Sequence, residues 1–414
     1  MPPSLAQARA RLDAYPIHEW TLVLVAATVL VVPLRGAVPA IVMAVVAAMG
    51  LATLLDRRFG PALTPAARPL AGLLAALVAW QAVGVAARRP FDAEDARALG
   101  SAVALALLFP IALAAARRDP DAPRRLLVVL LVLGAVSAAI SIALYVVAVA
   151  RHPDPVAYLR FIRLEPFGRA RHPILGAGGL AAAFLAGTAL LGAARRRLPV
   201  EVALGAIALA ILLTQSRGPI LALLLALAGM AVLGRVSDRR RPAAAALLGL
   251  ACFAVPVALV LAEPALVRLV CRGELGLCRP SMRGDVWAEL VGLIPSHPWF
   301  GLGPSHRLGA DTVGHAHNGL IGTAVFFGLP ALALLVAAMG HALARGGSLP
   351  AGPVRAFCLG GLLFGAAYLG SDLPNPFAFL NAHWLFLWTP LVLAVAASAA
   401  PGLARWEPGR EGRS

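Results

Sequence analysis

The amino-acid sequence predicts an all-α, polytopic integral membrane protein with about 12 transmembrane helices. Of its 414 residues, 60% are hydrophobic and only 14% are charged, whereas a soluble domain is about 45–50% apolar and about 25% charged. The mean hydropathy is +0.82. Because one crossing takes about 20 apolar residues, the chain can supply roughly a dozen. This composition excludes an ordinary soluble enzyme, a nucleic-acid-binding module and a disordered chain.

The predicted spans are stretches that are apolar on all faces, as expected of helices that face lipid or lie inside a bundle. The first two are separated only by the short turn Leu34-Arg35-Gly36. In chain order, the twelve spans are predicted at residues 19–33, 37–55, 67–86, 97–116, 125–150, 172–193, 198–214, 217–234, 242–263, 317–343, 352–371 and 383–400.

The distribution of arginine predicts the orientation of these spans. The sequence contains no lysine, so all 36 basic residues are arginines. With the N-terminus inside, 21 of them fall in cytoplasmic segments, including Arg117-Arg118, Arg195-Arg196-Arg197 and Arg239-Arg240-Arg241. Short connections rich in arginine are typical of the cytoplasmic side. Both termini are therefore predicted to be cytoplasmic, and the strong positive charge reflects topology rather than a nucleic-acid partner.

Two predicted outer connections run against this rule, because residues 151–171 and 264–316 together hold ten of the other 15 arginines. The second is the only long connection in a chain that otherwise forms a single transmembrane domain over residues 1–414. Loops of this length are usually functional or contain structure of their own. Its segment 285–294 has the apolar pattern of a short amphipathic helix on the membrane surface.

The first candidate motif is the turn Thr214-Gln215-Ser216-Arg217-Gly218-Pro219 between two spans. Ser216 is a natural N-cap, and Pro219 suits the first turn of the helix that follows. The free N–H groups of that turn, together with the charge of Arg217, would form an anion site. The alternative is an arginine that snorkels from a helix end to the interface.

The second motif joins Arg283-Gly284-Asp285-Val286-Trp287 to a Gly/Pro-rich stretch that contains Gly301 and Gly303. These glycines allow backbone conformations closed to other residues, which predicts a close approach to another segment. The alternative is a loop that packs on the membrane through its aromatic residues.

The third motif is His315-Ala316-His317-Asn318-Gly319 at the start of a span. At a helix start the positive dipole end favours a neutral imidazole, which can accept a proton. His315 is the nearest rival of His317, Asn318 is a possible orienting group, and Asp372 on the last outer loop could line the same cavity. A structural role for a single histidine is the alternative. No metal site is predicted, because no carboxylate or cysteine set lies at ligand spacing.

These residues come from separate parts of the chain, yet all of them are predicted on one membrane face. Two arginines and a histidine without a metal describe a site for a phosphate-bearing lipid and for proton abstraction. The sequence therefore predicts transfer of a group from a lipid diphosphate.

On these motifs the sequence resembles the O-antigen ligase and polymerase superfamily. The resemblance rests on Ser216-Arg217-Gly218, on the run from Arg283 through Trp287 to Gly303, and on His317-Asn318 followed by Gly328. It implies a helical fold of the C-type glycosyltransferase kind, with no metal or other cofactor. It also implies transfer of a glycan from undecaprenyl diphosphate to a sugar hydroxyl of lipid A–core, at the periplasmic face of the bacterial inner membrane.

Carried over to this chain, the resemblance implies that Arg217 and Arg283 bind the diphosphate and that His317 is the general base. Arg171 would hold a second phosphate. An O-antigen ligase is the first hypothesis, and a polymerase or a protein O-oligosaccharyltransferase of the same superfamily is the second. A transporter or lipid flippase is the third; it should show repeat symmetry and helices broken at mid-membrane.

Overall fold

The computed structural model describes residues 16–33, 36–56, 63–87, 92–270, 283–306, 316–373 and 375–400. Within these ranges the regular structure is helical, and no strand occurs. Eight of the helices are long and apolar enough to cross a membrane. The predicted all-α polytopic membrane fold is therefore confirmed.

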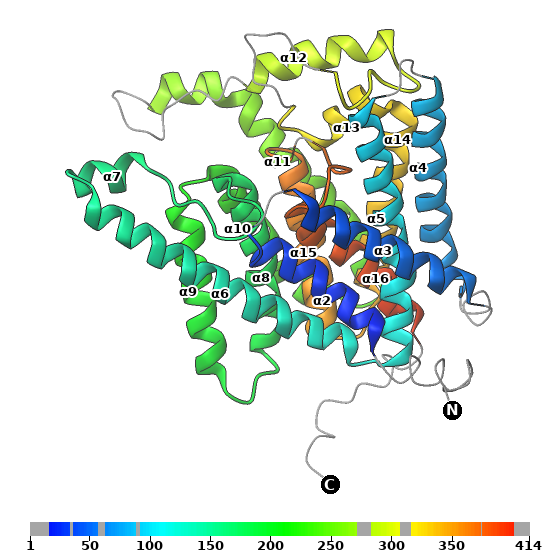
Figure 1. The fold of residues 1–414 in the computed structure, drawn as a ribbon, viewed down its shortest axis with the longest axis horizontal. Helices are drawn as coiled ribbons and strands as arrows, with labels where there is room; N and C mark the ends of the chain where they lie inside the picture. The colour runs from blue at the N-terminus through cyan, green and yellow to red at the C-terminus, as the bar shows by residue number, and fades with distance from the viewer. Residues whose placement is uncertain are drawn as a thin grey trace.

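Figure 1 shows the described helices packed side by side in one bundle. In chain order the helices are α2 (Ile17–Leu30), α3 (Ala37–Leu55), α4 (Arg68–Ala87), α5 (Ala93–Arg118), α6 (Ala122–Arg151), α7 (Pro155–Phe161), α8 (Pro173–Leu191), α9 (Arg197–Leu213), α10 (Arg217–Arg235), α11 (Arg241–Val270), α12 (Arg283–Leu293), the 3-10 turn η3 (Ile294–Ser296), α13 (Gly319–Phe327), α14 (Leu329–Gly347), α15 (Pro353–Leu369), the π-helical turn η4 (Trp384–Trp388) and α16 (Thr389–Ala399).

Each of the twelve predicted spans coincides with helical structure, although not always with a full crossing. Eight spans overlap the long apolar helices, and the other four overlap the shorter helices α2, α9, α15 and η4–α16. The agreement has a simple cause: an uninterrupted apolar run in lipid must satisfy its backbone hydrogen bonds internally, and a helix does so.

Three boundaries differ from the sequence prediction. The predicted span 317–343 is two helices, because Gly328 has a φ of +87° and Pro330 follows in the first turn of α14. α11 continues to Val270, seven residues beyond the predicted end of its span at Glu263. The last span begins as the π-helical turn η4, after which Pro390 lies in the first turn of α16. A proline lacks the N–H that a continuing helix would donate.

The core of the bundle is formed by α15 and α16, whose side chains are almost all buried. α15 packs against α8, α10, α11, α14 and α16. Glycines let these neighbours come close, since a Cβ at Gly361 would lie 2.7 Å from Pro390 and one at Gly360 would lie 2.6 Å from the Met230 sulfur. Small residues play this part in membrane bundles generally. The central position of α15 brings its C-terminal end against several other helices.

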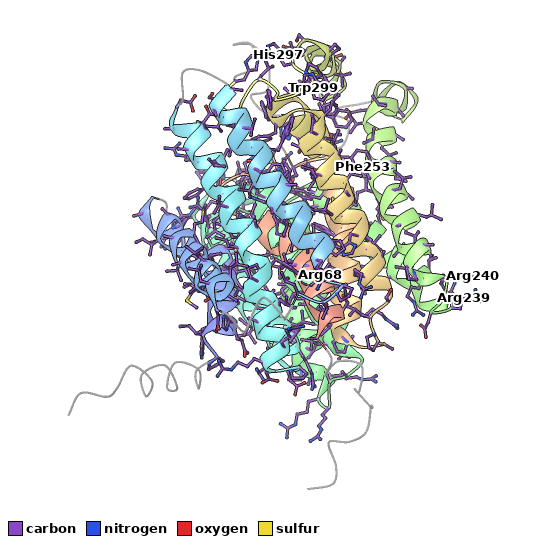
Figure 2. The ribbon with its side chains drawn as sticks, turned by 90° about the vertical axis from the view of Figure 1, so that its right-hand side faces the viewer. Arg68, Arg239, Arg240, Phe253, His297 and Trp299 are labelled. Atoms are coloured by element: carbon purple, nitrogen blue, oxygen red, sulfur yellow. The ribbon has the colours of Figure 1, made fainter. Side chains whose placement is uncertain are left out.

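The two ends of the bundle differ in character. Figure 2 shows His297 and Trp299 at one end and Arg239 and Arg240 at the opposite end. α12 lies across the former end (Figure 1), in the stretch where the sequence indicates an amphipathic helix. Val286, Trp287 and Leu290 of α12 are buried, and Val291 on its other side is half exposed.

Candidate active site

The α10 helix begins directly after a strained turn. Gln215 has a φ of +51°, a conformation that is uncommon for any residue other than glycine. Its side-chain amide donates to the Leu159 carbonyl over 3.1 Å. Arg217, the first residue of α10, is exposed at the end of the helix.

Ser216 occupies the N-cap position of α10, but its side chain does not cap the helix as the sequence predicts. The hydroxyl turns back and donates to the Thr214 carbonyl over 3.2 Å, and Ser216 makes no side-chain cap hydrogen bond. A hydroxyl that is turned toward the preceding turn faces away from the first-turn N–H groups of α10. The Ser216 side chain therefore leaves the first-turn N–H groups of α10 uncapped.

The α12 helix begins at Arg283, which binds a carboxylate far away in sequence. Its guanidinium donates to Asp372 Oδ1 over 2.5 Å, and the two side chains are 20% and 1% exposed. Asp372 lies in the turn that follows α15, where its own N–H donates to the Tyr368 carbonyl. A charge-assisted bond to a buried carboxylate is stronger than an exposed one, so this pair ties the start of α12 to the end of α15.

The same carboxylate contacts the start of α10. A Cβ built at Gly218 would lie 1.4 Å from Asp372 Oδ2, so only glycine fits beside this oxygen. Oδ2 is itself buried, and within the described ranges no donor forms a hydrogen bond with it. Asp372 therefore lies between the first turns of α10 and α12.

The α13 helix begins beside this turn as well. Asn318 caps it, because its side-chain oxygen accepts from the N–H groups of Leu320 and Ile321, while its amide donates to the Gly370 carbonyl over 3.5 Å. A Cβ at Gly319 would lie 2.3 Å from the Leu369 side chain. The start of α13 is thus packed directly on the end of α15.

His317 precedes this cap with a φ of +46°. His317 and Gln215 are the two residues other than glycine that have a positive φ in the described part of the chain, and each lies just before a helix at this site. Such conformations cost roughly 1–3 kcal/mol and concentrate at functional sites. The strain favours a functional role for both turns.

Trp287 fixes the backbone next to His317. Its indole N–H donates to the Ala316 carbonyl over 2.8 Å, and the bond is buried. Because Trp287 follows Arg283 by four residues, both side chains lie on one face of α12. One helix therefore positions the arginine through Asp372 and the histidine through Ala316.

The Gly/Pro-rich stretch makes the close approach that the sequence predicts, and its partner is protein backbone. The N–H groups of Leu302 and Gly303 donate to the carbonyls of Val325 and Phe326, over 2.7 and 3.1 Å. These carbonyls are left open because α13 stops at Gly328, where a Cβ would lie 1.6 Å from the Trp299 carbonyl oxygen. The two halves of the second motif thus differ. Arg283 and Trp287 contact Asp372 and Ala316, whereas the stretch with the glycines packs against the end of α13.

The loop before α8 contains two arginines, Arg169 and Arg171, whose surroundings differ. Arg169 is engaged with protein, since its guanidinium donates to the Leu380 carbonyl over 2.5 Å and lies 5.4 Å from the centre of the Phe379 ring. Arg171 is exposed just before α8, whose Ile174 carbonyl accepts from Tyr368 of α15 over 2.9 Å. Arg171 is therefore near the end of α15.

The structure thus gathers the starts of α10, α12 and α13 around one turn after α15. The Ser216–Gly218 segment, Arg283, Asn318 and Asp372 are joined through contacts, and His317 is next to Asn318. His315 lies outside the described residues. In the part of the chain that the structure describes, no group of three or more His, Cys, Asp or Glu residues could hold a metal ion.

Three residues that build this site lie inside the sequence motifs, but the sequence predicts no contact for them. Gly218 admits Asp372, Trp287 holds Ala316, and Gln215 forms the strained turn before α10. The spacing of Arg283 and Trp287 is a visible signal for one of them, because residues four apart share a helix face. No local signal pairs Gly218 with a residue 154 positions later.

A comparison with known families agrees with the motifs. Residues 202–336 match the family model described as O-antigen ligase. This segment includes the starts of α10, α12 and α13, whereas Asp372 and Arg171 lie outside it. The match confirms the resemblance to the O-antigen ligase and polymerase superfamily. No curated protein matches the chain.

Proposed function

We propose that this multi-pass membrane protein is an O-antigen ligase, a member of the O-antigen ligase and polymerase superfamily that its matching segment resembles. It transfers a glycan from undecaprenyl diphosphate to a sugar hydroxyl of lipid A–core, at the periplasmic face of the inner membrane. The observation that supports this most is the convergence of three helix N-termini around Asp372, with Arg217 and Arg283 at two of them and His317 before the third.

Arg217 and Arg283 bind the donor diphosphate in this proposal. Three helix starts that point into one region supply partial positive charge and backbone N–H groups, which suit an anion. Each arginine adds charge-assisted hydrogen bonds of about 1.5–3 kcal/mol. These bonds strengthen as negative charge builds on the departing diphosphate, so they stabilise the transition state more than the bound donor.

Asp372 acts as a positioning residue for Arg283. Its carboxylate neutralises only part of the local positive charge, and it sets the direction of the guanidinium through the 2.5 Å bond. Because Asp372 also touches Gly218, it sets the spacing between the α10 and α12 starts. This spacing determines whether two arginines can bind the same diphosphate.

His317 is the general base that activates the acceptor. The acceptor hydroxyl oxygen attacks the anomeric carbon of the donor sugar, its proton passes to the imidazole, and the bond from that carbon to the diphosphate oxygen breaks. The diphosphate leaves with the electron pair and is held by the two arginines. A positioned base contributes typically about 10²–10⁴-fold to such a step. No step in this proposal uses a metal ion.

The central test is a His317→Ala substitution in a strain that lacks the chromosomal copy. We expect the variant to insert and bind the lipid-linked donor but to form no smooth lipopolysaccharide. His297→Ala is the matched control, because His297 is an exposed histidine at the same end of the bundle (Figure 2). Near-normal smooth lipopolysaccharide from His317→Ala would refute the assignment, and loss of transfer from His315→Ala alone would move the role to His315.

The same profile distinguishes the ligase from the polymerase. Loss of a ligase leaves lipid A–core while lipid-linked polymer accumulates, whereas loss of a polymerase leaves core that carries a single repeat. Arg217→Lys and Arg283→Lys should each lose much of the activity, because lysine keeps the charge but not the planar fork that binds phosphate. If both lysine variants complemented as well as wild type, the arginines would be topological rather than catalytic.

A further inference from the structure

The short helix α7 presents an exposed surface next to the proposed site, with a composition that fits a charged lipid. Three apolar side chains of this segment are exposed: Val156 by 75%, Leu159 by 48% and Ile162 by 43%. Arg151 precedes α7, Arg163 follows it, and both are exposed. These five residues are called the α7 surface below. An apolar strip flanked by arginines is typical of an element that binds an anionic amphiphile.

The segment that carries the α7 surface is hydrogen-bonded to the turn before α10. The Leu159 carbonyl accepts from the side chain of Gln215, and the N–H of Leu164 donates to the Leu213 carbonyl over 3.0 Å. The hydroxyl of Tyr145 donates to the Ile162 carbonyl over 2.8 Å. Hydrogen bonds from both sides of the turn before Arg217 therefore fix the position of α7.

Within the described residues, the charges of this surface have no protein partner. The side chains of Arg151 and Arg163 form no ion pair or hydrogen bond with any residue in the described ranges. Arg169 of the same connection, in contrast, is bound to Leu380 and Phe379. Arginines on this side also oppose the topology preference of the chain. An anionic ligand would account for both observations.

The separation of the two arginines points to the acceptor rather than the donor. They flank a helix of seven residues, which is about 10 Å long. This arrangement suits a lipid with anionic groups at two separate positions better than a single diphosphate. The donor diphosphate already has Arg217 and Arg283 in the proposed function.

We propose that the α7 surface docks the acceptor, a glycolipid with phosphate groups on its lipid-proximal sugars. The phosphates contact Arg151 and Arg163, the lipid chains cover Val156 and Leu159, and the glycan extends over the α10 start toward His317. This inference rests on the proposed function, because it assigns the second substrate of the same reaction.

The test uses the full-length protein in vesicles of zwitterionic phosphatidylcholine, so that bulk lipid supplies no net negative charge. The acceptor is lipid A–core, used intact and after its phosphates have been removed, and the donor is the undecaprenyl-diphosphate-linked glycan. The variant is Arg151→Gln/Arg163→Gln. The matched control, Arg239→Gln/Arg240→Gln, removes two exposed arginines at the opposite end of the bundle.

We expect the α7 double variant to raise the KM for the intact acceptor about three- to tenfold, as the loss of two exposed ion pairs implies. The KM for the donor and kcat should not change, and the control variant should match wild type. Removal of the phosphates should raise the acceptor KM of wild type by a similar factor. It should have no further effect on the α7 variant, because the interaction is already absent.

Two results would overturn the inference. In the first, phosphate removal affects the α7 variant as strongly as wild type. In the second, the α7 variant is impaired only when anionic phospholipid is added to the vesicles, which would make the surface a general membrane anchor. Thermal unfolding of both variants checks that the fold is intact.

Equilibrium binding of the two acceptor forms to purified protein separates this inference from the proposed function. Absence of transfer by the wild-type protein would refute the ligase function. Phosphate-dependent binding that requires Arg151 and Arg163 would still support the α7 surface, and its absence would refute it.

Discussion

At the scale of single residues, the carboxylate of Asp372 connects two helix starts that are far apart in the sequence. One oxygen accepts from Arg283, and the other lies against Gly218. Breaking a buried ion pair by removal of one partner is costly, because it leaves an uncompensated charge. We therefore regard the Gly218–Asp372–Arg283 contact as the feature that aligns Arg217 and Arg283, the two arginines proposed to bind the diphosphate.

The contact predicts that Gly218→Ala lowers transfer sharply, because the added methyl group would lie 1.4 Å from Asp372 Oδ2 and must displace it. We expect the KM for the donor to rise while the protein still inserts in the membrane. Donor titration of the purified variant in vesicles measures this effect.

Gly234→Ala is the control for this prediction, since Gly234 lies in the same helix and a Cβ there meets nothing within 4 Å. It should be neutral or slightly stabilising, as glycine-to-alanine changes in open helical positions are. Equal donor KM values for the two alanine variants would show that Asp372 is not held as described.

At the scale of elements, α12 acts as a brace that serves two turns of the site at once. Its first residue binds Asp372, and its second turn binds the Ala316 carbonyl through Trp287. The backbone around His317 is strained, and strain of this kind persists only where surrounding contacts impose it. The position of the proposed base therefore depends on α12.

Trp287→Phe should reduce kcat while the protein still folds, although its stability falls. The substitution keeps most of the buried ring but removes the donor to Ala316, which leaves a buried carbonyl at a cost of about 1–3 kcal/mol. We expect a lower kcat with an unchanged donor KM, measured together with thermal unfolding of the purified variant.

Trp299→Phe is the matched change on an exposed ring, because Trp299 is 66% exposed at the same end of the bundle (Figure 2). It should leave kcat unchanged. A normal kcat for Trp287→Phe would mean that the Ala316 bond does not position His317.

At the scale of the whole molecule, the bundle separates the site from the basic connections. Figure 2 shows His297 and Trp299 at the end opposite to Arg239 and Arg240. Short arginine-rich connections mark the cytoplasmic side. From this polarity we expect the proposed site on the outer face, where a lipid-linked glycan would be used.

Alkaline phosphatase fused after Ser305 should be active, and the same enzyme fused after Ser237 should be silent, because it folds only outside the cytoplasm. Colony colour on a chromogenic phosphate ester reports both fusions, and immunoblots check that they are equally expressed. The reversed pattern would place the diphosphate site on the wrong side and would exclude the ligase function together with the acceptor surface at α7.

The sequence by itself determined the spans and the chemical types of the site residues. Both are local properties, because a continuous apolar run must become a helix in lipid, and an arginine or a histidine at a helix start has its chemistry wherever the helix lies. The break at Gly328 was missed, although Gly328 and Pro330 are visible in the sequence, because the surrounding apolar run hides it.

Only the tertiary structure decided which of these residues meet. Gly218 and Asp372 are brought together by the packing of α10 on α15, and Arg283 reaches the same carboxylate because α12 lies across the end of the bundle. The capping roles of Ser216 and Asn318 also differ, although each follows a residue with a positive φ: the Ser216 hydroxyl turns back to the Thr214 carbonyl, and the Asn318 oxygen accepts from the N–H groups of its helix. Such contacts arise from long-range packing between helices, which hydropathy and residue spacing do not encode.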